Sequence, residues 1–413
     1  MVEFWILQFV ALIRPILFIE FGAQNLFDIG GVAIVLALSA ALLLKAAVGK
    51  SLQFGAIDAL VAAFAVWCVA CAVIYPETLD IRGLAKLVTP LLGYTVAKNI
   101  IQNESQFMKI VGLMLIGYVV PVSLSAILIA TGKGVEEYGA NYWTGLLRWE
   151  GVYDGAHNMG HNMAFVLMLG MLYLARTSER VVQGVAGVSR ATLYGMGVLA
   201  AAAVYCLWMS QVRTALFGLA IFSGIFFYRY NRKLLVAGLL VGGVGLAVFF
   251  PIVKPYLFPD IMMVERTGGD VTELASGRPG FWTHNLTAFG NLPIDRQIAG
   301  VGIGQNRLPG FIDSHNDILD LMVQAGVVGV TLFLAIQWLM FRRIIALPPT
   351  SRYPFLALFI AVFFMNLASN SYVARFGLAQ MLYLVLAFAE LRQVREARVE
   401  TAVPGQSKVV TDL

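Results

Sequence analysis

The segment of residues 313–341 has the sequence DSHNDILDLMVQAGVVGVTLFLAIQWLMF. It opens with five polar residues and continues as a mainly apolar run. An α-helix needs about 20 apolar residues to cross the hydrocarbon core of a membrane, so this run is long enough to do so. Runs of the same kind recur along the chain, which predicts a membrane protein with many spans.

The amino-acid composition also indicates a membrane protein. Of the 413 residues, 59% are hydrophobic and only 13% are charged, and the mean hydropathy is +0.78. Soluble globular proteins have roughly 45–50% apolar and about 25% charged residues. These values exclude a soluble enzyme, a disordered chain and a secreted disulfide scaffold. The net charge of +5 comes from basic residues scattered between apolar runs, which does not favour a nucleic-acid partner.

The apolar runs predict an all-α polytopic bundle of about twelve transmembrane helices. The first run is the weakest because Arg14 and Pro15 interrupt it. The expected spans are 4–21, 30–48, 55–74, 81–98, 107–130, 160–176, 191–209, 212–229, 234–252, 317–341, 354–371 and 374–391.

The positions of Lys and Arg predict the orientation. Seventeen of the 29 basic residues lie in the connections after even-numbered spans or in the C-terminal tail, and such short basic segments face the cytoplasm. Both termini are then cytoplasmic, and residues 393–413 form a flexible tail. The long connections 131–159 and 253–316 lie on the other side. They are rich in aromatic residues, so we expect them to fold into a cap on the bundle 1–392.

The strongest local candidate for chemistry is His315. Ser314 and Asp317 have the spacing of a capping box, which would put His315 in the first helical turn. The positive end of a helix disfavours a charged imidazole, so the ring would be neutral and able to accept a proton. The alternative is that the run only caps a helix.

Two arginines are expected on the same side. Arg213 lies between two apolar runs, and Arg278 precedes Pro279, which is well placed to start a short helix. Guanidinium groups bind phosphate bidentately and keep their charge, so the pair could neutralise a pyrophosphate leaving group without a metal. The alternatives are an interfacial anchor for Arg213 and a solvated loop residue for Arg278.

Further polar residues on this side are weaker candidates for substrate binding. The spacing of His157 and His161 would also suit two metal ligands on one helical face, but no third ligand accompanies them, so no metal and no cofactor is expected. Arg82, Lys86 and Arg375 lie at the ends of spans and could bind phosphate, but they could equally be interfacial anchors. The set comprises Arg148, His157, His161, Asn162, Arg82, Lys86 and Arg375.

One segment resembles a known family. Residues 313–329 are similar to the signature of the O-antigen ligase/polymerase family, His-Asn followed by an apolar helix and Gly-x-x-Gly, matched by His315, Asn316, Gly326 and Gly329. Arg213 in Ser-x-x-Arg-Thr and Arg278 in Ser-Gly-Arg-x-x-x-Trp also match, and Asn162 matches weakly. The resemblance covers roughly residues 155–340 in motif.

The resemblance implies a bacterial inner-membrane glycosyltransferase with a GT-C-like bundle and a periplasmic active site. Its donor would be a glycan on undecaprenyl pyrophosphate. Its acceptor would be another lipid-linked repeat unit in a polymerase, or lipid A-core in a ligase. Arg213 and Arg278 would hold the pyrophosphate, Asn316 would contact substrate, and His315 would activate the acceptor hydroxyl in a single inverting displacement.

The motif details favour a polymerase of O-antigen or exopolysaccharide repeat units, and the ligase remains the alternative. A transporter or lipid flippase would fit the span count. Transporters place polar groups near the membrane midplane, on broken helices in repeated halves. The candidates here gather at one surface, and no repeat is visible.

Overall fold

The computed structural model describes residues 2–19, 24–47, 52–75, 80–140, 146–182, 189–258, 261, 277–303, 310–369, 372 and 375–391. Parts of both long connections and the predicted tail 393–413 lie outside these ranges. The first half of the described chain contains α1 (Val2–Ile13), η1 (Ile16–Phe18), α2 (Gln24–Ala47), α3 (Ala56–Ile74), α4 (Ile81–Ile100), α5 (Glu104–Ala130), β1 (Val135–Ala140), β2 (Leu147–Trp149) and α6 (Ala156–Val182).

The second half continues as helices. It contains α7 (Arg190–Ser210), α8 (Arg213–Tyr230), α9 (Arg232–Val248), α10 (Phe250–Leu257), α12 (Arg278–Gly290), α13 (Ile294–Ala299), α14 (Asp317–Ile345), α15 (Pro349–Ala368), α16 (Phe376–Leu386) and η4 (Ala387–Glu390). Neighbouring helices pack as α15 on α8, α16 on α4, α6 on α7 and α14 on α3. The chain is an all-α polytopic membrane protein, and its described residues also include a small antiparallel hairpin, β1–β2.

Each predicted span overlaps at least one helix, but fewer than twelve helices of the described residues meet the criteria for crossing a membrane. Among the described residues, five helices are long and apolar enough, α3, α5, α7, α14 and α15. A sixth is added if α9 and α10, which meet at a 98° bend, count as one broken span. The first predicted span ends early: α1 stops at Ile13, directly before Arg14 and Pro15, because proline cannot continue the hydrogen-bond ladder.

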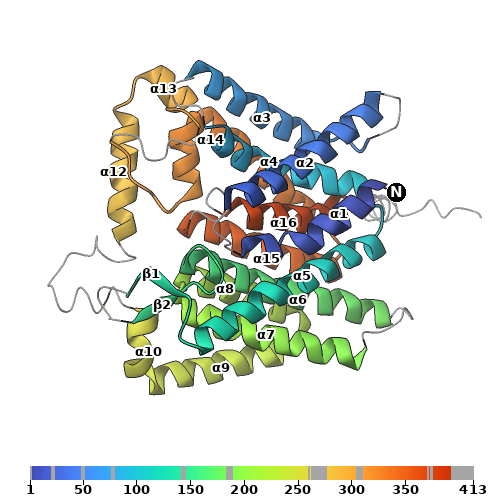
Figure 1. Cartoon of the computed structure of the whole chain (residues 1–413), viewed down its shortest axis with the longest axis vertical. Coiled ribbons are helices and arrows are strands. Elements are labelled where there is room, and N and C mark those ends of the chain that lie inside the picture. The colour runs from blue at the N-terminus through green and yellow to red at the C-terminus, as the bar shows by residue number, and fades with distance from the viewer. Residues whose placement is uncertain are drawn as a thin grey trace, which may run out of the picture.

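The exterior of the bundle is apolar, as a lipid-facing surface requires. None of the residues of α9 is buried, and Leu239, Val241 and Val244 are more than half exposed. The interior holds one continuous apolar core, in which Phe355 stacks on Phe388 with ring centroids 4.4 Å apart. Figure 1 shows the hairpin, α10, α12 and α13 together at one end of the bundle, opposite the N-terminus.

Helix α14 is broken at Gly326, where φ is +69° and the backbone leaves the helical region. A Cβ at this position would lie 2.0 Å from the carbonyl oxygen of Ile298, so only glycine allows the approach of α13. The break exposes backbone carbonyls, and protein donors satisfy them: Val301 N–H bonds Val323 at 2.8 Å, and Trp67 Nε1 bonds Ala325 at 2.8 Å. The first half of α14 is thereby fixed as a short, rigid helix.

Candidate active site

A cavity of about 430 Å³ lies among the ends of several helices, beside the strand β2. Elements far apart in the sequence form its wall: β2, α6, the α7–α8 turn, α10, α12, the segment before α14, and α15. Three arginines and two histidines line it, Arg148, Arg213, Arg278, His157 and His315. The same wall contains the aromatic side chains of Phe217, Tyr256, Trp282 and Phe364. The cavity therefore combines concentrated positive charge with aromatic surfaces.

The α7–α8 turn places Arg213 as the first residue of α8. Gln211 adopts a left-handed conformation (φ +54°) and donates from Nε2 to the carbonyl of Leu147 at 2.8 Å, which ties the turn to β2. The Ser210 hydroxyl accepts from the backbone N–H of Val212 at 3.3 Å. Arg213 is thus held on a closely packed turn.

Arg278 is the first residue of α12, preceded by Gly277 in the left-handed region (φ +73°). The prediction that Pro279 starts a short helix is confirmed, because α12 begins at Arg278 with the proline in its first turn. The guanidinium Nη1 donates to the carbonyl of Ala368 at the end of α15. This bond fixes one edge of the guanidinium group.

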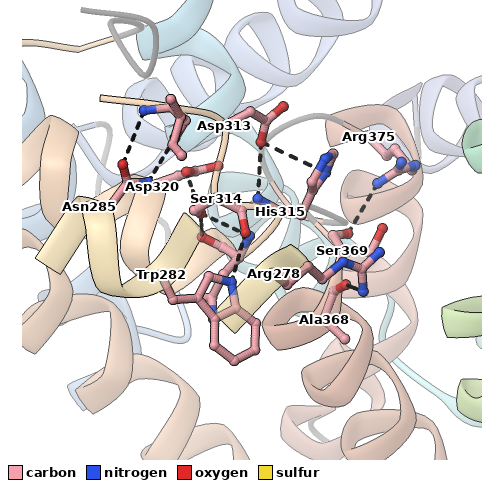
Figure 2. A network of polar contacts seen from close by, with 12 residues as sticks. Arg278, Trp282, Asn285, Asp313, Ser314, His315, Asp320, Ala368, Ser369 and Arg375 are labelled. Atoms are coloured by element: carbon pink, nitrogen blue, oxygen red, sulfur yellow. Dashed lines mark hydrogen bonds and ion pairs between the residues drawn. The ribbon is translucent and has the colours of Figure 1, made fainter. Parts of the chain in front are cut away.

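Helix α12 also holds the segment that carries His315. Trp282 Nε1 donates to the carbonyl of Ser314 at 2.8 Å, and Asn285 exchanges two hydrogen bonds with the backbone of Ile312, at 2.7 and 3.1 Å. The buried Ser314 hydroxyl bonds Asp320 of α14 at 2.6 Å. Figure 2 shows these contacts around His315.

The predicted capping box is wrong. Asn316, not Ser314, caps α14: its side chain accepts from the N–H groups of Ile318 and Leu319 at 2.9 and 3.2 Å. Asparagine caps as well as serine does, and the Ser314 hydroxyl is already bonded to Asp320. His315 therefore precedes the helix instead of lying in its first turn, and it adopts a left-handed backbone (φ +50°) that is uncommon for a residue with a side chain.

The environment of His315 favours the neutral ring. Burial lowers its pKa from the ordinary value, the carboxylate of Asp313 opposes that shift, and the charges of Arg278 and Arg375 lower the pKa further. The Nδ1 atom lies 3.8 Å from Oδ1 of Asp313. A neutral imidazole near pH 7 can accept a proton from a hydroxyl group bound in the cavity.

His157 and His161 lie on one face of α6, as their spacing predicts. Their ring centroids are 6.3 Å apart, and His157 stacks on His315 at the same distance. His161 is buried behind the cavity wall, with Nδ1 2.7 Å from the carbonyl of His157 and Nε2 3.5 Å from the hydroxyl of Thr214. No group of three potential metal ligands occurs within the described part of the chain.

The other predicted contacts lie outside the cavity lining. Asn162 is buried and accepts from the Tyr118 hydroxyl at 2.7 Å, so it joins α6 to α5. Arg375 precedes α16 and donates to the carbonyl of Ser369 at 3.1 Å, behind His315. Arg82 and Lys86 are in the first turns of α4, and Asn316 is a helix cap. These predicted substrate-binding residues therefore do not line the cavity.

Sequence reasoning assigned no role to Asp313, Gln211 or Tyr256. Asp313 was visible as the first residue of the Asp-Ser-His-Asn-Asp run, and aspartate side chains often accept a hydrogen bond from the backbone two residues on. Tyr256 stacks on Trp208, with ring centroids 5.3 Å apart, and carries no local pattern that would have marked it.

A comparison with protein families gives one finding. Residues 196–334 match the family model described as O-Antigen ligase. This segment of the chain is similar to that family. The match begins within α7 and ends within α14, so it includes Arg213, Arg278, His315 and the glycine at the break of α14. No curated protein matches the chain.

Proposed function

We propose that this protein is an inverting, metal-independent glycosyltransferase that uses a glycan linked to undecaprenyl pyrophosphate, at the periplasmic face of a bacterial inner membrane. The observation that carries the proposal is the cavity shared by Arg213, Arg278 and His315, which come from three separate segments of the family match. A structural scaffold would not need two guanidinium groups and a neutral histidine around one space.

Arg213 and Arg278 bind the pyrophosphate of the donor. Guanidinium groups pair with phosphate oxygens through two parallel hydrogen bonds and remain charged at any physiological pH. Arg148 adds a third positive charge from β2. These charges stabilise the leaving group as negative charge builds up on it, the task that a metal ion performs in other transferases.

His315 activates the acceptor. Its ring accepts the proton of an acceptor hydroxyl while the hydroxyl oxygen attacks the anomeric carbon of the donor sugar. The bond from that carbon to the pyrophosphate oxygen breaks, undecaprenyl pyrophosphate leaves, and the configuration at the anomeric carbon inverts. The aromatic wall, including Trp282 and Tyr256, provides faces on which sugar rings pack.

The acceptor is a second lipid-linked repeat unit, so the product is a longer O-antigen or exopolysaccharide chain. The Asp-Ser-His-Asn-Asp run and the Ser-Gly-Arg-x-x-x-Trp segment support this polymerase assignment. The alternative acceptor is lipid A-core, which the description of the matching family as O-Antigen ligase supports.

The test supplies purified protein with lipid-linked repeat units, alone and together with lipid A-core. A ladder of longer lipid-linked chains without lipid A-core supports the polymerase. Glycan on lipid A-core, with no ladder in its absence, supports the ligase instead. Uptake of either lipid into sealed vesicles without any new glycosidic bond would favour a flippase and overturn the proposal.

A further inference from the structure

Asp313 and His315 form a compact unit at the edge of the cavity. Building on the proposed function, we propose that Asp313 is a positioning residue, which holds the His315 ring with its proton on Nδ1 and so presents Nε2 to the acceptor hydroxyl. Histidine bases in other enzymes are oriented by a carboxylate at the opposite ring nitrogen in the same way.

The backbone of the turn brings the carboxylate to the ring. Oδ1 of Asp313 accepts from the backbone N–H of His315 at 3.0 Å, which is an Asx turn, and the same oxygen lies 3.8 Å from Nδ1 of the ring. The left-handed conformation of His315 turns its side chain back toward this oxygen (Figure 2). At 3.8 Å the attraction is electrostatic, and it favours a proton on Nδ1.

The segment around the turn is rigid. Ser314 is fully buried between its bonds to Asp320 and Trp282, so the two residues that flank it cannot move independently. Within the described part of the chain, no hydrogen bond reaches Nε2 of His315, and the ring lines the cavity. Nδ1 therefore faces the carboxylate, and Nε2 is the nitrogen left for a substrate proton.

The charges around His315 explain why a carboxylate is needed there. Arg278 on α12 and Arg375 before α16 both disfavour a positive charge on the ring, and His157 on α6 stacks against it. The carboxylate of Asp313 acts against them, because its negative charge raises the pKa of His315. Without it, the ring would be a weaker base held among cations, and it would share its proton between two nitrogens.

Asp313→Asn separates the charge from the geometry. The amide oxygen of asparagine can still accept from the His315 N–H, so the Asx turn is kept while the negative charge is lost. Asp295→Asn is the matched control, because Asp295 is an exposed acid of α13 that does not line the cavity. Asp313→Ala removes the charge and the acceptor together.

Two measurements test how the Asp313 substitutions change His315. The first is the pH profile of kcat/KM for glycan transfer by the purified protein. The second is titration of His315 by NMR in protein labelled at histidine; the chain has four histidines, and His315→Ala identifies the resonance. Two unit charges about 4 Å apart in well-screened surroundings change a pKa by roughly 0.5–1 unit.

We expect Asp313→Asn to move the acid limb of the profile and the NMR midpoint down by about 0.5–1 pH unit, and to lower the plateau several-fold. Asp313→Ala should lower the plateau further, and Asp295→Asn should match the wild type in both. An unchanged NMR midpoint in Asp313→Asn would overturn the inference. A shifted midpoint with an unshifted acid limb would contradict His315 as the base, which is a failure of the proposed function instead.

Discussion

Replacing Arg278 with lysine tests whether the cavity binds phosphate through the shape of guanidinium or through charge alone. Lysine keeps one positive charge but loses the planar fork that matches two phosphate oxygens. In the structure, one of the five guanidinium N–H groups already donates to the carbonyl of Ala368. A lysine ammonium has three N–H groups, and satisfying that carbonyl turns it away from the substrate.

The magnitude follows from the hydrogen bonds lost. A hydrogen bond to a charged group contributes about 1.5–3 kcal/mol, and we expect Arg278→Lys to lose one such bond to the pyrophosphate in the transition state. That loss corresponds to roughly a 10- to 100-fold decrease in kcat/KM. The acid limb of the pH profile should stay in place, because lysine preserves the positive charge that lowers the pKa of His315.

The assay is the transfer of glycan between lipid-linked repeat units, measured on protein purified in nanodiscs. Arg296→Lys is the control, since Arg296 of α13 packs over the ring of Tyr75 and does not line the cavity. We expect the control to be within twofold of the wild type. Full activity in Arg278→Lys would refute bidentate phosphate binding by this residue.

Other predictions concern pH, metal and stability. The kcat/KM of the wild type should fall as pH drops through a midpoint below the ordinary histidine value of 6.5, because His315 must be neutral and its pKa is lowered; a midpoint above 6.5 would contradict this. Transfer should be unchanged in excess EDTA, and a loss would revive a metal site. Gly326→Ala should destabilise the fold by roughly 3 kcal/mol, from positive φ and overpacking, whereas Gly243→Ala, which meets no atom within 4 Å, should not lower the thermal midpoint. Lys98→Met should cost about 3–5 kcal/mol in stability because it leaves Asp58 buried without its ion pair, and the added change Asp58→Asn should recover most of that loss.

Much of the fold follows from the sequence because apolar runs and charge positions act locally. The approximate positions of the helices could be predicted, but the first span was expected to reach residue 21, whereas α1 ends at Ile13. The break at Gly326 could not, because it depends on the approach of α13 from a separate segment. The bend between α9 and α10 could not be predicted either, because the apolar run continues across it.

The site shows the same division. Its central residues, Arg213, Arg278 and His315, could be predicted because each lies in a local motif. Their meeting in one cavity depends on packing between α8, α12 and α14, which no local pattern records. The weaker candidates divided for a similar reason: Arg148 and His157 line the cavity, whereas Asn162 is held in the core by a hydrogen bond from α5.

Comparing wild-type protein with His315→Ala in transfer from a lipid-pyrophosphate-linked repeat unit tests directly whether His315 is the general base. Both proteins should insert and unfold at similar temperatures, because the His315 side chain is 40% exposed and caps no helix. We expect the wild type to build glycan chains and the variant to lose at least about 100-fold in rate, because a general base has been removed. Transfer by His315→Ala at the wild-type rate would contradict the role of His315 as the general base.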